Sequence, residues 1–250
     1  MATEIPLKSV SAAERPCKIC GCAARLFGQV DFNRSCEETR SQILPVLGIP
    51  VHYHRCTSCR FLFTECFDEW NQADFKQFIY NEDYIRVDPD YLEARPATNA
   101  RYMITKFYQD RSKIRILDFG GGNGRLAHRL LAAGFTNVET YDPFTPEFSV
   151  LPDSRFDLIT SFETFEHLPD PLSALDTVVK LLAPNGAVLF STLVQPPAFE
   201  DIGMSWWYIG PRNGHVSLFS DRALAVAWQR HRFKVASFSP GVHLAFQDDL

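Results

Sequence analysis

The sequence lacks the long apolar runs that a membrane-spanning protein requires. Its 250 residues contain no stretch of roughly eighteen consecutive apolar residues, and the first eight contain no apolar core of an export signal. Internal repeats and low-complexity tracts are also absent, and the net charge is only −5. These absences exclude a transmembrane span and argue against a large nucleic-acid footprint. They predict a cytoplasmic protein with no membrane partner.

Cysteine, in contrast, is plentiful and regularly spaced. Four of the seven cysteines form two Cys-x-x-Cys pairs, Cys17 with Cys20 and Cys56 with Cys59, separated by 35 residues. In a reducing compartment such pairs favour metal binding over disulfides, because each tight turn holds one ion with two thiolates. Four thiolates make the closed tetrahedral site that zinc prefers. The sequence therefore predicts a structural Zn²⁺ ion.

Neighbouring residues leave alternatives to this assignment. His52 and His54 lie close to the second pair, so either imidazole is an alternative to one thiolate, although both also fit a strand leading into the pair. The remaining cysteines, Cys22, Cys36 and Cys66, are interpreted as reduced thiols.

Composition divides the chain into three expected segments. Residues 1–66 form a zinc-binding module that is too small to bury much core without its ion. Residues 67–112 are rich in aromatic side chains and are expected to form a helical lid or linker. Residues 113–250 carry the strand and helix patterns of an α/β core.

A strand, a glycine turn and a helix lie at the start of this core. Residues 114–119 are apolar apart from Arg115 and Asp118, and Gly120, Gly122 and Gly124 follow. A turn of this kind lets backbone approach a ligand closely. A dinucleotide-binding turn usually cradles a pyrophosphate, whereas an acid before the first glycine would repel phosphate and attract an amine.

The second expected strand, residues 137–141, ends at an acid. Asp142 stands 18 residues after Gly124, where a carboxylate can accept the ribose hydroxyls of a nucleoside, and Phe144 could stack on the base. Only 13 residues separate Asp142 from Phe156, where the next strand, 156–162, begins. A further strand and its crossover do not fit in that length. The sequence therefore predicts a shortened or missing third strand.

The glycine turn and the stretch Glu163–Pro171 together resemble class I S-adenosylmethionine-dependent methyltransferases. This resemblance implies an α/β, Rossmann-like methyltransferase sheet with a shortened third-strand region, plus a small N-terminal module like a zinc ribbon. A fifth strand is expected at 187–193 and a C-terminal antiparallel hairpin at 233–238 and 242–246. S-adenosyl-L-methionine would then be bound by a set of carboxylates, glycines and one aromatic ring: Asp118, Gly120, Gly122, Gly124, Asp142, Phe144 and Glu163.

The spacing Glu-x-x-Glu-His places Glu163, Glu166 and His167 on one face of a helical turn. His215, in a later loop rich in glycine and aromatics, is the natural second histidine. His167, His215 and Glu166 are therefore the candidate catalytic residues, acting as a general base. A second divalent ion held by these residues and Glu163 is the alternative, since similar ubiquinone-pathway and plant small-RNA O-methyltransferases bind magnesium-like ions. Simple capping and packing is the third interpretation.

The order of cysteine pairs, aromatic segment and core also resembles the N-terminal two-thirds of deoxysugar C-methyltransferases. In that family an acid precedes the histidine that stands at His215, whereas this chain has Gly214. In methyltransferases the aromatic segment commonly covers the cofactor, so Tyr80 or Tyr84 is expected either to face the substrate or simply to pack.

Taken together, these features predict methyl transfer to oxygen or carbon of a small polar acceptor such as a sugar or nucleotide sugar. Two rivals stay open. One is an RNA methyltransferase that grips nucleic acid with the zinc module, against which the acidic charge argues. The other is a binding module that retains the fold without catalysis. The sequence leaves the oligomeric state open.

Overall fold

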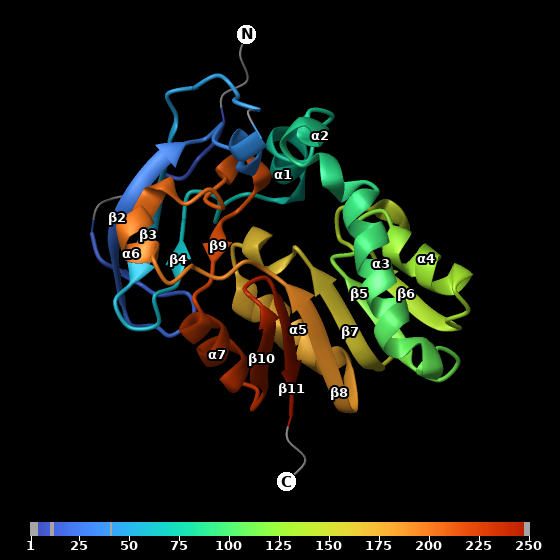
Figure 1. Ribbon diagram of the computed structural model, residues 1–250. Helices are drawn as coiled ribbons and strands as arrows, with labels where there is room; N and C mark the ends of the chain where they lie inside the picture. Colours follow the sequence, from blue (N-terminus) through green and yellow to red (C-terminus); the bar gives the residue numbers. More distant parts are fainter. Residues whose placement is uncertain (1–4, 11–12, 41, 248–250) are drawn as a thin grey trace. The chain divides into compact units, whose positions relative to one another are not determined.

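The computed structural model describes residues 5–10, 13–40 and 42–247, and its chain forms two compact units (Figure 1). The first unit comprises Met1–Asp88, Phe165–Ala174 and Leu193–Ala227. The second comprises Pro89–Thr164, Leu175–Thr192 and Trp228–Leu250. The expected segment 113–250 thus contributes to both units, and the three-segment division stays a prediction. In the described residues, no helix has the length and apolar character needed to cross a bilayer.

The second unit is built on a six-stranded sheet with the order β10-β11-β8-β7-β5-β6. Four neighbouring strands are parallel, whereas β11 is antiparallel to β8 and to β10. The strands are β5 (Arg115–Phe119), β6 (Asn137–Tyr141), β7 (Phe156–Phe162), β8 (Leu182–Ser191), β10 (Lys234–Ser239) and β11 (Val242–Phe246). The parallel sheet and its C-terminal antiparallel hairpin confirm the predicted α/β fold.

The shortened third-strand region is also confirmed. Among the described residues, the connection between β6 and β7 holds one 3₁₀ helix, Pro146–Phe148, and no strand. In this sheet β6 therefore pairs with β5 alone and is an edge strand. The length of this connection was enough to predict the missing strand, because a strand plus a crossover helix needs more residues than it has.

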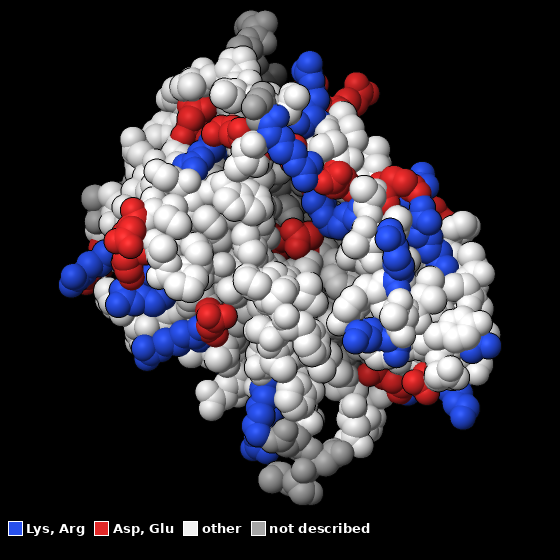
Figure 2. Space-filling model, viewed as in Figure 1, with Lys and Arg blue, Asp and Glu red and all other residues white. Residues whose placement is uncertain are grey.

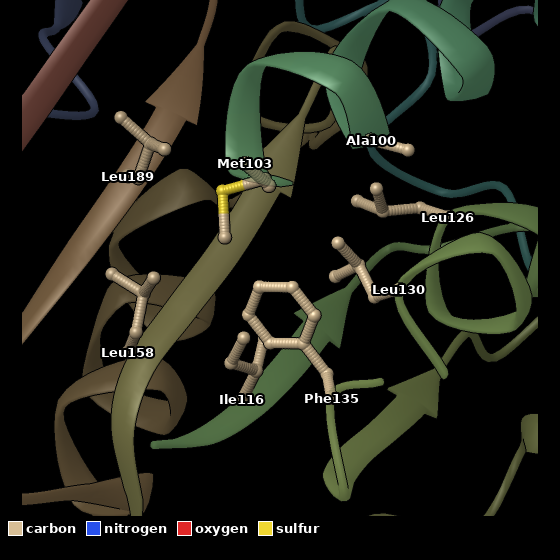
Figure 3. Close-up of a cluster of buried hydrophobic side chains, with 8 residues drawn as sticks. All are labelled: Ala100, Met103, Ile116, Leu126, Leu130, Phe135, Leu158 and Leu189. Carbon is tan, nitrogen blue, oxygen red and sulfur yellow. The ribbon is translucent and has the colours of Figure 1, made fainter. Parts of the chain in front are cut away.

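Two helices cover one face of this sheet. Helix α3 (Ala94–Phe107) and helix α4 (Arg125–Ala132) pack together over β5, and Figure 1 shows α5 (Pro171–Leu181) on the opposite face. Figure 3 shows the buried side chains that α3 and α4 share with the sheet: Ala100, Met103, Ile116, Leu126, Leu130, Phe135, Leu158 and Leu189. Because β5 is buried on both faces, its apolar residues run nearly without interruption.

One strand begins earlier than expected. The strand predicted at 187–193 is β8, which runs from Leu182 to Ser191. It includes Pro184-Asn-Gly186, three residue types that are typical of turns. Asn185 has φ 62°, and the pairing of β7 with β8 is irregular between Phe156 and Leu158. Turn residues inside a strand often mark such irregularities. Because they look like the end of a loop, the predicted start of this strand was five residues too late.

The first unit contains a five-stranded antiparallel sheet with the order β1-β2-β3-β4-β9. Its strands are β1 (Arg15–Pro16), β2 (Ala23–Asp31), β3 (Pro50–Cys56), β4 (Leu62–Phe63) and β9 (Ser217–Leu218). The last strand comes from the C-terminal half of the sequence and joins the cysteine-bearing strands at β4. This pairing ties the segment that carries His215 to the N-terminal sheet.

The described part of the first unit also contains the helices α1 (Gln72–Phe78), α2 (Tyr84–Val87), α6 (Phe199–Ile202) and most of α7 (Asp221–Gln229). Asn71 and Asp74 form a capping box that starts α1. The aromatic rings of this region form a core of their own, in which Trp70 makes edge contacts with Phe67 and Phe75. Tyr84 is buried in this unit, whereas the ring centroid of Tyr80 lies 6.2 Å from that of His167, so a role of Tyr80 toward a substrate stays a prediction.

Candidate active site

In the second unit the three glycines of the turn after β5 have different constraints. A side-chain carbon on Gly120 would come within 2.5 Å of Thr164, and one on Gly124 within 2.7 Å of the Phe148 ring. Gly122 has φ +55°, and nothing lies within 4 Å of where its Cβ would point. Glycine is thus required at the outer two positions for close packing, whereas Gly122 presents bare backbone to open space.

Asp142 holds this turn against the end of β6. One of its carboxylate oxygens accepts a hydrogen bond from the Gly122 backbone N–H at 2.9 Å, and the other accepts from Phe144 N–H at 2.8 Å. The Thr145 hydroxyl donates to the Gly122 carbonyl at 2.8 Å. The loop after β6 therefore fixes the glycine turn through both oxygens of the Asp142 carboxylate.

Asp118 lies beneath the same turn. Burial raises the pKa of the Asp118 carboxyl to about 7, and the nearby charge of Asp142 acts in the same direction. The Thr160 hydroxyl donates to Asp118 at 2.9 Å and partly offsets this effect. A buried acid of this kind favours a cationic partner, since a positive charge nearby stabilises the ionised form. The structure thus brings Asp118, the glycine turn and Asp142 together, and their role toward a cofactor stays a prediction.

The other two predicted cofactor residues have local partners. Glu163 follows β7 with a φ of 52°, and its carboxylate accepts a hydrogen bond from the Ser191 hydroxyl at 2.7 Å. Its own N–H donates to the Ser191 hydroxyl at 2.8 Å, which ties together the ends of β7 and β8. Phe144 is partly buried beside Asp142. Their roles toward a cofactor stay predictions.

In the first unit Glu166, His167 and His215 come together. Their ligand atoms all lie within 4.8 Å of one another, and the two imidazole ring centroids are 4.9 Å apart. Glu166 is fully buried and His215 is nearly so. The backbone joins the two segments, because Val216 N–H donates to the Glu166 carbonyl at 2.8 Å. Two imidazoles and a carboxylate can accept a proton or hold a divalent ion.

Glu163 does not belong to this group, which corrects the expected four-residue ion site. The prediction placed Glu163 and Glu166 on one helical face, but the 3₁₀ helix spans only Phe165–His167 and Glu163 precedes it in a left-handed conformation. Among the described residues, the ligand group therefore consists of Glu166, His167 and His215. The i, i+3 rule failed because it requires a continuous helix.

The loop that carries His215 is held by polar contacts from within the first unit. The Tyr53 hydroxyl donates to the His215 carbonyl at 2.7 Å, and the Cys36 N–H donates to the Asn213 side chain at 2.8 Å. Arg212 donates to the Ile79 carbonyl at 2.9 Å. These contacts make the loop a fixed part of the unit, so His215 is not a solvent-exposed loop histidine.

The four paired cysteines form a second ligand group. Cys17, Cys20, Cys56 and Cys59 have their sulfur atoms within 4.8 Å of one another, with Cys17–Cys59 at 3.6 Å and Cys20–Cys56 at 3.4 Å. Neither His52 nor His54 is in this group. No disulfide joins any of the seven cysteines, so the pairs are not disulfides. This donor set suits a tetrahedral, sulfur-preferring ion such as zinc.

Both cysteine pairs adopt the same local conformation. In each, the first cysteine's N–H donates to the carbonyl five residues later, from Cys17 to Cys22 at 2.8 Å and from Cys56 to Phe61 at 2.9 Å. The Cys59 N–H also donates to the Cys56 sulfur at 3.3 Å. The residue after each pair is left-handed, namely Gly21 and Arg60. Such turns direct N–H groups at sulfur and favour thiolates.

Comparison with known proteins fixes the family. Residues 91–237 match a family described as "Methyltransferase domain", which covers more than half of the chain. The chain belongs to this family. The predicted membership of the S-adenosylmethionine-dependent methyltransferases is thereby confirmed, whereas the narrower resemblance to deoxysugar C-methyltransferases is not.

Curated relatives match a shorter stretch. The ubiquinone biosynthesis O-methyltransferase of Aromatoleum aromaticum is 29% identical over 102 residues, 32% of this chain and 44% of that protein. The enzyme of the same name from Alkalilimnicola ehrlichii is 33% identical over 106 residues, 33% of this chain and 43% of that protein. This methyltransferase thus matches less than half the length of either relative.

A solved structure agrees with the fold. It is the 1,6-didemethyltoxoflavin-N1-methyltransferase of Burkholderia thailandensis, with 1,6-didemethyltoxoflavin and S-adenosylhomocysteine bound. It is 17% identical, covers 71% of this chain and 87% of its own, and has a TM-score of 0.50. At this identity the likeness concerns the fold alone.

Proposed function

We propose that this chain transfers a methyl group from S-adenosylmethionine to a hydroxyl oxygen of a small acceptor. The observation that carries the proposal is the group of Glu166, His167 and His215, which supplies proton-accepting side chains and in which Glu166 and His215 are buried. Family membership and the names of the relatives, which are O-methyltransferases, support the reaction type. The expected sugar or nucleotide-sugar acceptor receives no support from those relatives.

The second unit would hold the cofactor. S-adenosylmethionine supplies a methyl group on a sulfonium, so transfer breaks the sulfur–methyl bond, forms an oxygen–methyl bond and releases S-adenosylhomocysteine and a proton. The buried Asp118 carboxylate would bind the amino group, and Asp142 would accept the ribose hydroxyls. Gly122, with open space before it, lets the ligand approach the backbone, while Phe144 and Glu163 would complete the site.

The first unit would supply the general base that removes the proton. His167 would accept it from the acceptor hydroxyl, and Glu166 with His215 would stabilise the imidazolium that forms, since a carboxylate favours a nearby positive charge. The same three residues are also a ligand set for a divalent ion that polarises the hydroxyl. Three protein ligands with an open position are also typical of a catalytic metal site, and metal dependence distinguishes the two mechanisms.

The test is a screen for transfer of a labelled methyl group to hydroxylated aromatics, sugars, nucleotide sugars and RNA. With the acceptor found, His167→Ala should lower turnover about 10²–10⁴-fold, as expected for loss of a general base, while cofactor affinity is unchanged. His128→Ala, which removes an exposed imidazole on α4, is the control and should retain full activity. Unchanged turnover in His167→Ala would refute the base assignment.

Metal dependence separates the base from the ion. A base requires no divalent cation, so mild chelation that leaves the cysteine-bound metal in place should not change turnover. If activity instead falls and returns with added Mg²⁺, and Glu166→Gln abolishes that response, the general-base mechanism is wrong and a bound divalent ion activates the hydroxyl.

We also propose that Cys17, Cys20, Cys56 and Cys59 hold a structural Zn²⁺ ion. The equal conformation of the two cysteine turns and the absence of a histidine from the group support this proposal. The site would stabilise the first unit and would not contact the acceptor. Nucleic-acid binding is not favoured, because positive and negative side chains are interspersed on the face drawn in Figure 2.

A further inference from the structure

Tyr208, in the loop before His215, contacts two members of the proposed catalytic group at once. Its hydroxyl donates to a Glu166 carboxylate oxygen at 2.6 Å, and its backbone carbonyl lies 2.8 Å from Nδ1 of His215. Its ring centroid is 4.2 Å from that of His215. Tyr208 is 3% exposed, so these contacts are made away from solvent.

The hydroxyl of Tyr208 has a defined orientation. The Leu193 backbone N–H donates to the Tyr208 oxygen at 3.3 Å, so that oxygen is an acceptor toward Leu193. Its single proton is then directed at Glu166, which makes a short hydrogen bond to a buried carboxylate. A buried carboxylate needs such a donor, because removing charge from water without a partner costs free energy.

The carbonyl of Tyr208 fixes the tautomer of His215. A carbonyl only accepts, so the His215 Nδ1 beside it must carry the proton. In the neutral ring the other nitrogen, Nε2, then keeps its lone pair. The Cys36 sulfur, 3.5 Å from the same Nδ1, is too weak a partner to compete with the carbonyl.

We propose that Tyr208 is a positioning residue that holds the Glu166 carboxylate and the Nδ1-protonated form of His215 for proton uptake by His167. This inference rests on the proposed function, since it assigns a role relative to that reaction. Tyr208 itself need not touch the acceptor. Its spacing from Glu166, 42 residues along the chain, explains why the sequence alone did not indicate it.

The test is the variant Tyr208→Phe, which removes the hydroxyl but keeps the ring and the backbone carbonyl. Turnover should fall about 10–100-fold, the range typical of lost supporting contacts, with the Michaelis constants for acceptor and cofactor within twofold of wild type. The acid limb of the turnover–pH profile should move to higher pH, because Glu166 loses its donor and is protonated more easily.

The control is Trp70→Phe. Trp70 is another buried aromatic residue of the same unit, and its ring N–H donates to a backbone carbonyl, that of Pro6, at 2.9 Å. Both variants remove one buried donor and should lose thermal stability, yet Trp70→Phe should keep turnover within about threefold and an unchanged pH profile. Equal losses of turnover in both variants, or wild-type kinetics in Tyr208→Phe, would overturn the inference.

This experiment keeps the two proposals apart. If His167→Ala is inactive while Tyr208→Phe behaves as wild type, the reaction stands and the positioning role fails. If wild type itself transfers no methyl group to any acceptor, the proposed function fails, and Tyr208 can have no role in proton uptake.

Discussion

At the scale of single residues, the burial of Asp118 should make the binding of a cationic ligand depend on pH. Its carboxyl is 3% exposed, and burial raises its pKa to about 7. An acid in that state is ionised above neutrality and protonated below it. A cationic group bound beside it would stabilise the ionised form, so ligand affinity and pH should be coupled at this one residue.

Cofactor affinity should therefore fall in acid. With a pKa near 7, the ionised fraction of Asp118 drops about tenfold between pH 8 and pH 6, and the dissociation constant for S-adenosylmethionine should rise by about the same factor. Calorimetric titrations at the two pH values measure it. Asp118→Asn should bind weakly at both pH values with no such dependence. Equal wild-type affinity at pH 6 and 8 would contradict this role.

Gly214 offers a second residue-scale prediction. It has φ +86°, and a Cβ there would lie 3.1 Å from Nδ1 of His167. Gly214→Ala should cost about 1–2 kcal/mol of stability from backbone strain and should also lower turnover by displacing His167. Thermal unfolding and steady-state kinetics measure the two effects.

Gly48→Ala is the control for Gly214→Ala. Gly48 also has a left-handed backbone, φ +73°, but nothing lies within 4 Å of where its Cβ would point. It should show a similar stability loss with normal turnover. If the two variants have the same turnover, contact with His167 does not matter for activity.

At the scale of elements, the sequence predicted the parallel sheet better than the small one. The bounds of β6, β7 and β11 agree with the predicted ranges, because each is a short run with turn residues on both sides. The missing third strand followed from chain length. Strand β9 was not predicted, since two residues carry no periodic pattern and their pairing with β4 is distant in sequence.

At the scale of elements, the two cysteine turns are predicted to hold one zinc ion. Wild-type protein should contain one zinc ion per chain by elemental analysis, and Cys59→Ser should lose it. Cys59→Ser should also lower turnover, since β4 follows that turn and pairs with β9, two residues beyond His215. Cys22→Ser, which removes an exposed thiol outside the ligand group, should keep both. Zinc retained in Cys59→Ser would contradict the ligand assignment.

At the scale of the whole molecule, the sequence could not show which distant segments pack together. Residues 165–174 and 193–227 belong to the first unit although they follow core strands of the second. This arrangement places His215 with His167, as the sequence predicted. It also places Tyr208 beside Glu166, which the sequence did not predict because contact of a hydroxyl with a carboxylate leaves no local pattern.

The most direct test of the account is a calorimetric titration of S-adenosylmethionine into the full chain at pH 8, where Asp118 is ionised. The account predicts saturable binding of one molecule per chain, with the affinity lost in Asp142→Ala, which removes the carboxylate that fixes Gly122. No binding to the wild-type chain would contradict it and would leave a methyltransferase fold without its cofactor.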